Sequence, residues 1–575
     1  MPDETSLQPF IFPCQGGLVL NRSTFTMSPG QAFELQNFEP DIKGGYRRIN
    51  GYEKWNANVV PQSASETEKV LMSAYLSGEI IAARGTSVYR ASNGSDTLNG
   101  SVDAVSTTIN VDSTEGFSYD GTILIGNEQI TYTSTDSVTF YGCTRGVNST
   151  VAVDHTDGDV VTQAWTEIEY GRASASKYTH FRYNISGFET IAYTDGANYP
   201  SYFVSGTSSA VPIDTTNAPA DPKYVTGFKN TLFFAGMSAN PQELVFTAPY
   251  GPTDFSPANG AGSIRVDSPI TGIFPFRDSL FIFCEERIFR LDGNTISDFV
   301  LQPVSRNIGC INGFTIQEFA GDIVFLGRDG LRTVAGTEKI GDVELGSIST
   351  PVHQLFNQYS DVSEFDSLVI PDKTQYRIFF CDTEGSAART RTQTKGVICS
   401  RDPEGYSFSE TLGIQPSCTD SINYRGTVYA IHGGYDGYVY RQERGNTFDG
   451  TTIIGKYRSP DITMGDAGIR KNFQRVIINY APEGSVNSDL FVRYDYDSNE
   501  APRPAAYPFD SSKVVAIYGV GAYGSVTYGG QSNPLVRQPI EGSGFAIAIR
   551  VVDNGVSVPY SLKGFQLEFD TGARR

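Results

Sequence analysis

Short apolar strands separated by polar turns recur along most of the chain, and the clearest copy spans residues 269–293. Its apolar opening leads into a polar turn at residues 277–279 and then into the dense strand Leu280 to Phe283. Charged residues 285–287 precede a last short strand, which ends at Asp292-Gly293. Strand-forming residues between turn formers predict a β-meander of about 25 residues.

Six further segments repeat this order, at residues 69–91, 178–203, 224–247, 311–335, 365–400 and 419–441. The later first strands begin near Val225, Thr271, Asn312, Asp366 and Asp420, roughly 41 to 54 residues apart, which is the spacing of propeller blades. The pattern predicts an all-β protein with a β-propeller of about six to eight blades, and seven copies are counted. A β-sandwich made of the same strands is the alternative fold, but it would lack this period.

Three regions depart from the pattern and set the predicted domain boundaries. Residues 1–60 predict an N-terminal arm or assembly region, and residues 95–165 predict a compact inserted β module. Residues 446–575 carry longer alternating strands between Pro/Gly/Asp loops, which predicts a C-terminal β-sandwich or jelly-roll-like domain. The propeller then comprises residues 61–94 and 166–445. Residues 350–359 (TPVHQLFNQY) form the one segment that predicts a helix.

Composition narrows the classes of function. The 575 residues carry a formal net charge of −20 and no run of Lys or Arg, so a basic groove that grips nucleic acid is disfavoured. The seven Cys are odd in number and form no C-x-x-C pair. They predict buried free thiols of a protein made in a reducing compartment.

Four dispersed His make a His-based metal site improbable, and no cofactor motif is present. The first residues lack the features of a signal peptide, and no apolar stretch is long enough to span a membrane.

Catalytic residues of a propeller enzyme would lie at the mouth of the predicted channel. The starts of the inner strands offer a mixed set with no repeated catalytic box: Ser73, Thr271, Asn312, Asp366 and Asp420. G-x-S-x-G, H-E-x-x-H and Walker motifs are absent. A propeller glycosidase would place several carboxylates and aromatic rings there. We expect the protein not to be an enzyme.

One small basic constellation stands out in this acidic chain. Arg47 and Arg48 follow the turn residues Gly44 and Gly45. Arginine forks bind carboxylates at subunit contacts, although a solvated pair beside a turn is the alternative interpretation. The candidate residues for an assembly interface are Gly44, Gly45, Tyr46, Arg47, Arg48 and Tyr52. Replacing both arginines with Glu is expected to block assembly and to leave the melting temperature nearly unchanged.

The sequence resembles the tail nozzle proteins of short-tailed bacteriophages, also called tail tubular protein B. The N-terminal region carries the resemblance with GGLVLNRSTFTMSPGQAFELQNFEPDIKGGYRRINGYEKW. The C-terminal part adds KNFQRV and SLKGFQLEFDTGARR. The inserted module, with TILIGNEQITYTS, FYGCTRGVNST and DHTDGDVV, looks like a small β unit of other phage structural proteins.

The resemblance implies a structural virion protein, made in the host bacterial cytoplasm and located in the tail. Such a protein is expected to form a homo-hexameric ring that docks to the head–tail adaptor and conducts double-stranded DNA during genome ejection. Tail fibre or needle proteins are further expected partners. A host-surface-binding propeller adhesin and a polysaccharide-degrading tail enzyme are the alternatives.

Overall fold

The computed structural model describes residues 7–62, 69–173, 177–185, 187–335, 347–356, 364–380, 395–402, 405–484, 486–511, 535–556 and 558–574. Strands dominate this part of the chain, which confirms the all-β class. The predicted helix at residues 350–359 is short: a 3-10 turn, η4 (Thr350–Val352), leads into α2 (His353–Phe356). Residues 357–359 lie outside the described residues.

Each of the seven predicted segments forms three consecutive antiparallel strands, and six of the seven sheets have a fourth. The first two sheets are β6 (Val70–Leu76), β7 (Glu79–Arg84), β8 (Ser87–Ala91) and β16 (Thr166–Glu169), then β17 (Thr179–Ile185), β18 (Phe188–Thr194), β19 (Ser201–Val204) and β20 (Val211–Pro212). The next two are β21 (Tyr224–Phe228), β22 (Thr231–Ala235), β23 (Glu243–Phe246) and β24 (Gly262–Arg265), then β25 (Ile270–Phe276), β26 (Ser279–Cys284), β27 (Ile288–Asp292) and β28 (Val300–Ser305).

The fifth sheet has three described strands: β29 (Gln317–Phe319), β30 (Asp322–Gly327) and β31 (Gly330–Thr333). The sixth sheet contains β32 (Asp366–Ile370), β33 (Gln375–Phe380), β34 (Lys395–Asp402) and β35 (Gly405–Leu412). The seventh contains β36 (Pro416–Tyr424), β37 (Thr427–Gly434), β38 (Val439–Gln442) and β5 (Tyr52–Lys54), with β39 (Thr447–Phe448) and β40 (Thr451–Thr452) beyond it. Its fourth strand therefore comes from the N-terminal part of the chain.

Turn chemistry and apolar density explain the central strands. In the fourth sheet, Arg277 adopts a φ of +53° at the turn that joins β25 to β26. Strand β26 is apolar on both faces, and Leu280, Ile282 and Cys284 are fully buried against β25 and the third sheet. A strand covered on both faces needs no polar alternation, which is why this segment is a dense apolar run in the sequence.

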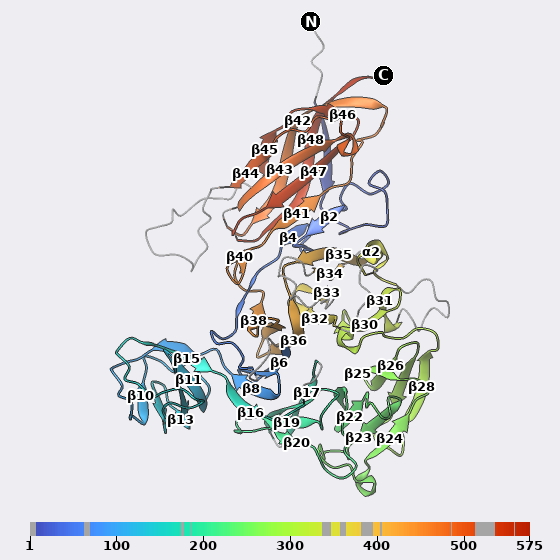
Figure 1. The fold of residues 1–575 in the computed structure, drawn as a ribbon. Coiled ribbons are helices and arrows are strands. Elements are labelled where there is room, and N and C mark those ends of the chain that lie inside the picture. The colour runs from blue at the N-terminus through green and yellow to red at the C-terminus, as the bar shows by residue number, and fades with distance from the viewer. Residues whose placement is uncertain are drawn as a thin grey trace.

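The seven first strands follow one another in a closed series. Strand β21 contacts β17 and β25, β32 contacts β29 and β36, and β36 contacts β6. The 3-10 turn η2 (Gly313–Thr315) bridges β25 and β32. Between the first two sheets, Arg182 Nε donates to the Tyr75 carbonyl oxygen at 2.6 Å. Figure 1 shows these sheets side by side below the C-terminal strands.

The inserted segment folds as its own unit between β8 and β16. One of its sheets contains β9 (Ser95–Thr97), β11 (Gly121–Ile125), β12 (Glu128–Tyr132) and β15 (Val160–Ala164). The other contains β10 (Thr108–Asn110), β13 (Ser134–Thr135) and β14 (Thr139–Tyr141). A separate apolar core includes Ile109, Ile123, Ile130 and Phe140. Figure 1 shows this unit projecting to one side, beside β8 and β16.

One further sheet and the five strands that continue the sixth sheet pack on a common core near the C-terminus, and we call these two layers the two-sheet domain. One sheet contains β1 (Gln8–Pro13), β3 (Phe38–Pro40), β4 (Tyr46–Arg48), β42 (Ile469–Pro482), β45 (Leu535–Pro539), β46 (Ser543–Gly544) and β48 (Tyr560–Arg574). The other contains β2 (Glu34–Gln36), β41 (Gly455–Arg458), β43 (Val486–Tyr494), β44 (Tyr507–Ser511) and β47 (Ile547–Asp553).

The N-terminal residues do not form a separate arm. Strands β1 and β4 pair with β48, while β2 pairs with both β35 and β41. Through β2, the sixth sheet continues into the two-sheet domain as one nine-stranded sheet. The described residues 7–54 therefore connect the ring of sheets to the C-terminal strands. Local sequence pattern carries no signal for this, because the paired strands lie several hundred residues apart.

Candidate functional site

A cavity of about 330 Å³ lies where the first strands of all seven sheets meet. Its lining includes one or more residues from each sheet or from the loop just before it: Ser73, Arg182, Thr226, Pro275, Gln317, Asp366 and Asp420. Three of the five residues expected at the mouth of the predicted channel line it: Ser73, Asp366 and Asp420. Two acidic groups, Asp366 and Asp420, line it together with the basic groups of Lys177, His180 and Arg182.

Asp366 is buried and holds the sixth sheet against its neighbours. Its carboxylate lies 3.1 Å from Lys177 Nζ, and it accepts hydrogen bonds from the Thr419 backbone N–H at 2.9 Å and hydroxyl at 3.0 Å. Burial raises the pKa of Asp366 above its usual range, and the charge of Lys177 offsets only part of that rise. The group thus joins the sixth sheet to the seventh and to the segment that precedes the second.

Asp420, on the first strand of the seventh sheet, also joins neighbouring sheets. It forms an ion pair with Arg182, accepts a hydrogen bond from the Tyr75 backbone N–H at 2.9 Å, and lies 3.4 Å from His180 Nε2. Burial alone would raise the pKa of Asp420, but Arg182 and His180 outweigh it and hold the pKa well below its usual range. One carboxylate thereby links the first, second and seventh sheets.

The five inner-strand residues named from the sequence separate into two groups. Ser73, Asp366 and Asp420 line the cavity. Thr271 and Asn312 bond to backbone instead, since Thr271 Oγ1 donates to the Cys310 carbonyl at 2.6 Å and Asn312 Nδ2 donates to the Phe365 carbonyl at 3.1 Å. Every one of these groups takes part in a contact between sheets. The arrangement therefore suits holding the ring closed.

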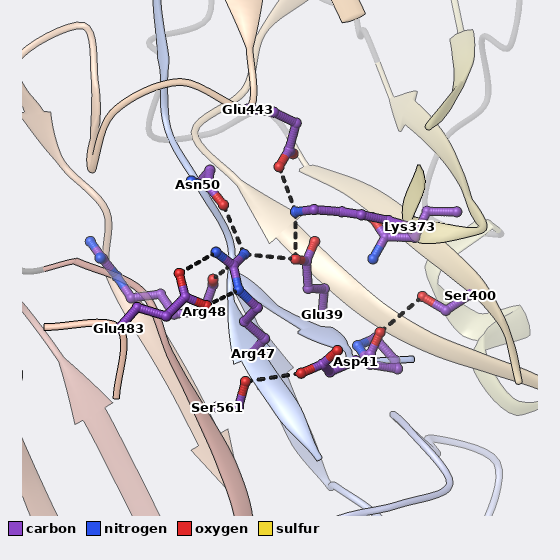
Figure 2. Close-up of polar contacts among 12 residues, drawn as sticks. Glu39, Asp41, Arg47, Arg48, Asn50, Lys373, Ser400, Glu443, Glu483 and Ser561 are labelled. Carbon is purple, nitrogen blue, oxygen red and sulfur yellow. Dashed lines mark hydrogen bonds and ion pairs between the residues drawn. The ribbon is translucent and has the colours of Figure 1, made fainter. Parts of the chain in front are cut away.

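A group of buried ion pairs lies where residues 37–50 cross between the ring and the two-sheet domain (Figure 2). Glu39 is buried at its centre and receives three cations. Its carboxylate lies 3.1 Å from Arg47 Nη1, 2.6 Å from Lys373 Nζ and 3.0 Å from Arg377 Nη2. We call these residues, together with Glu443 and Glu483, the junction cluster.

Two further acids complete the junction cluster. Glu443, which follows β38, lies 2.5 Å from Lys373 Nζ and 2.7 Å from Arg377 Nη2. Burial alone would raise its pKa, but these two cations lower it to about 2. Glu483, in the loop after β42, accepts a bidentate pair from Arg47 at 2.6 and 2.8 Å. The cluster therefore ties the sixth and seventh sheets to the two-sheet domain.

Arg48 points the other way and is completely buried. Its Nε lies 3.0 Å from Asp553 Oδ2, and Nη2 donates to the carbonyl oxygens of Asn446 and Gly555 at 3.2 and 3.1 Å. Both charged side chains of the pair are 0% exposed. Burial lowers the pKa of Arg48 and raises that of Asp553, and each partner offsets only part of the other's shift.

Five of the six predicted assembly residues are thus buried or half-buried within the fold. Tyr46 is buried and donates to the Gly30 carbonyl at 2.7 Å, while Tyr52 stacks on Phe448 in the seventh sheet. Gly44 is exposed, and Gly45 approaches the Leu562 carbonyl too closely for a Cβ. The arginines do bind carboxylates, as their chemistry predicts, but the carboxylates belong to the same chain. Sequence reasoning missed Glu39, Lys373, Arg377, Glu443 and Glu483, because nothing local marks partners so distant in sequence.

The six described cysteines are all buried free thiols, as predicted, and Cys381 lies outside the described residues. Burial raises the pKa of Cys418, in the wall of the central cavity, to about 11. Within the described ranges, no group of three or more His, Cys, Asp or Glu side chains is placed to hold a metal ion. Nor does any helix among those residues have the length and apolar character needed to cross a membrane.

Fold and clusters together define an all-β protein in which a ring of sheets is joined to a two-sheet domain by buried ion pairs. No family model matches the chain, and no curated protein matches it. Among solved structures, it is similar to Hsv2p of Kluyveromyces lactis, with 9% sequence identity and a TM-score of 0.27. That match covers 60% of this chain and 98% of the Hsv2p chain.

Proposed function

We propose that the seven sheets are the blades of a β-propeller, interrupted by the inserted module and followed by a C-terminal β-sandwich. The shared cavity and the contact of β36 with β6 support this interpretation. The last blade takes its outer strand β5 from the N-terminal part of the chain. Strands from distant parts of the chain then close the ring, so the propeller resists opening.

We propose further that the protein is a structural subunit of a bacteriophage tail, a nozzle through which the genome leaves. The observation that carries this proposal is the join between the two parts of the molecule. A continuous nine-stranded sheet and the buried junction cluster fix the sandwich on the propeller. A subunit that bears load in a tube needs such a fixed shape, whereas an enzyme that closes on its substrate needs a hinge.

Charge and the N-terminal sequence add to the proposal. The N-terminal and C-terminal motifs resemble those of tail nozzle proteins, and the net charge is −20. A ring of such subunits repels DNA over about 8–10 Å at physiological salt, so DNA passes without adhering. The proposed partners are further copies of this chain in a hexamer, the head–tail adaptor, tail fibre or needle proteins, and DNA in transit. The proposed location is the virion tail.

Imaging of the purified protein tests this function. Mass photometry and negative-stain microscopy, alone and after mixing with the adaptor, are expected to show six-subunit rings. A chain that stays monomeric even with the adaptor would refute the nozzle. Binding on a glycan array without rings would favour an adhesin, and release of reducing sugar from host polysaccharide would favour an enzyme.

A further inference from the structure

A pocket of about 420 Å³ lies where the inserted module meets the first and seventh sheets. The module contributes residues 116–120, the first sheet contributes the turn between β6 and β7, and the seventh contributes β37 and β38. The volume is within the range of small-ligand sites. The side chains that matter are Tyr75, Arg90, Ser118, Tyr119, Tyr429 and Arg441.

Arg441 is held in the pocket wall without an acidic partner. Its guanidinium lies over the Tyr429 ring at 4.2 Å, and Tyr429 also stacks on Tyr75 with centroids 4.2 Å apart. No carboxylate in the described part of the chain forms an ion pair with Arg441, not even that of Glu53, its neighbour across the strand pair. Burial, reinforced by Arg444, lowers the pKa of Arg441.

Among the described residues Arg441 has no carboxylate partner, although the chain has 20 more acidic than basic residues. The contact with Tyr429 restrains the guanidinium, and a restrained planar fork loses little entropy when it binds a carboxylate through two hydrogen bonds. The geometry therefore suits an anionic ligand.

Two other polar atoms of the lining lack partners among the described residues. Ser118 is 6% exposed and its Oγ makes no hydrogen bond, and the same holds for Nε of the 3% exposed Arg90. The remaining Arg90 nitrogens bind Glu79 at 2.8 Å and Asp120 at 2.7 Å, which neutralises the acids of the pocket in part.

Tyr119 supplies an aromatic surface at the same site. Its side chain is 70% exposed although it lines the pocket. A phenol ring offers an apolar face and a hydroxyl together, which matches the C–H face and the hydroxyls of a sugar ring.

We propose that this pocket binds an acidic saccharide. The carboxylate is bound by Arg441, the sugar ring packs on Tyr119, and the hydroxyls bond to the polar lining that includes Asn93. The inserted module then has a purpose that goes beyond the nozzle: it completes a sugar site with the propeller. The proposal does not depend on ring formation.

Calorimetric titration of the full-length protein with methyl glucuronide, methyl glucoside and acetate tests the proposal. Methyl glucuronide is expected to bind at least about tenfold more tightly than either of the other two, since it alone offers both the carboxylate and the ring. Arg441→Gln is expected to weaken that binding at least about tenfold and to leave the weak binding of methyl glucoside unchanged. Tyr119→Ala is expected to weaken the binding of both sugars.

Arg425→Gln is the matched control, because Arg425 also lies over a tyrosine ring, Tyr424 at 5.1 Å, but does not line the pocket. This variant is expected to bind methyl glucuronide like the unmodified protein. Tyr119 is exposed, so Tyr119→Ala keeps the fold even if Arg441→Gln lowers the melting temperature. Acetate that binds as tightly as methyl glucuronide overturns the saccharide assignment. Absence of methyl glucuronide binding, or equal binding by the Arg441→Gln variant, overturns the site.

Discussion

Replacing Arg48 with Met tests whether the N-terminal segment is a structural element of the fold. The substitution keeps an unbranched stem but removes the guanidinium and with it the charge that faces Asp553 at 3.0 Å, where both groups are 0% exposed. At an effective dielectric constant of about 20, the lost attraction is about 5 kcal/mol. The carbonyls of Asn446 and Gly555 also lose their donor.

Part of that attraction is offset in the native protein by the cost of taking both charges out of water, so the net loss is smaller. Leaving one member of a buried pair alone costs about 3–5 kcal/mol, and we expect Arg48→Met to destabilise the two-sheet domain by that amount. The loss is measured by urea unfolding followed with hydrogen exchange, read on peptides that cover β4, β47 and β48. The same reasoning changes the expectation for the double Glu reversal: Arg48→Glu would bury a second carboxylate beside Asp553, which should lower the melting temperature strongly.

Two further variants separate charge from packing. Adding Asp553→Asn to Arg48→Met removes the orphaned carboxylate, and we expect it to restore at least about 2 kcal/mol. Arg475→Met breaks the more exposed pair with Glu568, at 3.2 Å in the same sheet, and should cost less than about 1 kcal/mol. A cost for Arg48→Met as small as that of Arg475→Met would refute the reasoning, as would a double variant no more stable than the single one.

Three other predictions follow from the described contacts. Glu39→Gln leaves Arg47, Lys373 and Arg377 with only Glu443 and Glu483. We therefore expect the free energy of unfolding to fall by about 3 kcal/mol and hydrogen exchange in β3 and β33 to become faster. Unchanged exchange in these strands would contradict the role of the junction cluster. Asn37 has a φ of +55°, and Asn37→Ala removes its side-chain bonds to Leu412 and Ile454. We expect the free energy of unfolding in urea to fall by about 3–5 kcal/mol. Asn37→Gly relieves only the backbone strain, so it should recover about 1 kcal/mol of that loss. In the inserted module, burial alone would raise the pKa of Glu128, but bonds from Arg145, the Val153 N–H and His155 lower it to about 2. Because the pKa is lower in the folded state, this stabilisation is complete above the unfolded value of 4.5 and is lost as pH falls towards 2; Glu128→Gln should flatten the pH dependence of unfolding in peptides 121–132, and a profile as steep as that of the unmodified protein would contradict it.

Much of the ring could be predicted from the sequence because its signals are local. Apolar runs such as Leu280 to Phe283 lie between turns whose residues adopt positive φ, including Lys229 at +48° and Arg277 at +53°. The strands of the inserted module pair only with one another.

The N-terminal segment could not be placed in this way. The Arg47–Glu483 and Arg48–Asp553 pairs join residues more than 400 positions apart, and Tyr52 packs in the seventh sheet beside residues near position 440. Charge and residue type correctly indicated that the arginines bind carboxylates. They carried no information on whether those carboxylates belong to another subunit or to the same chain.

The position of the two-sheet domain on the ring depends on a few residues of this segment. Strand β2 joins the sixth sheet through a single parallel register pair, Gln36 with Glu410. The next residue, Asn37, reinforces the join with bonds to both sides, and Glu39 adds its three cations. One ladder contact alone would let the two parts rotate, whereas bonds to Leu412, Ile454, Lys373 and Arg47 constrain that rotation from several directions. A fixed arrangement of the two parts therefore requires residues 36–48 to be in place, which makes this segment, rather than either large part, the element that sets the shape of the molecule.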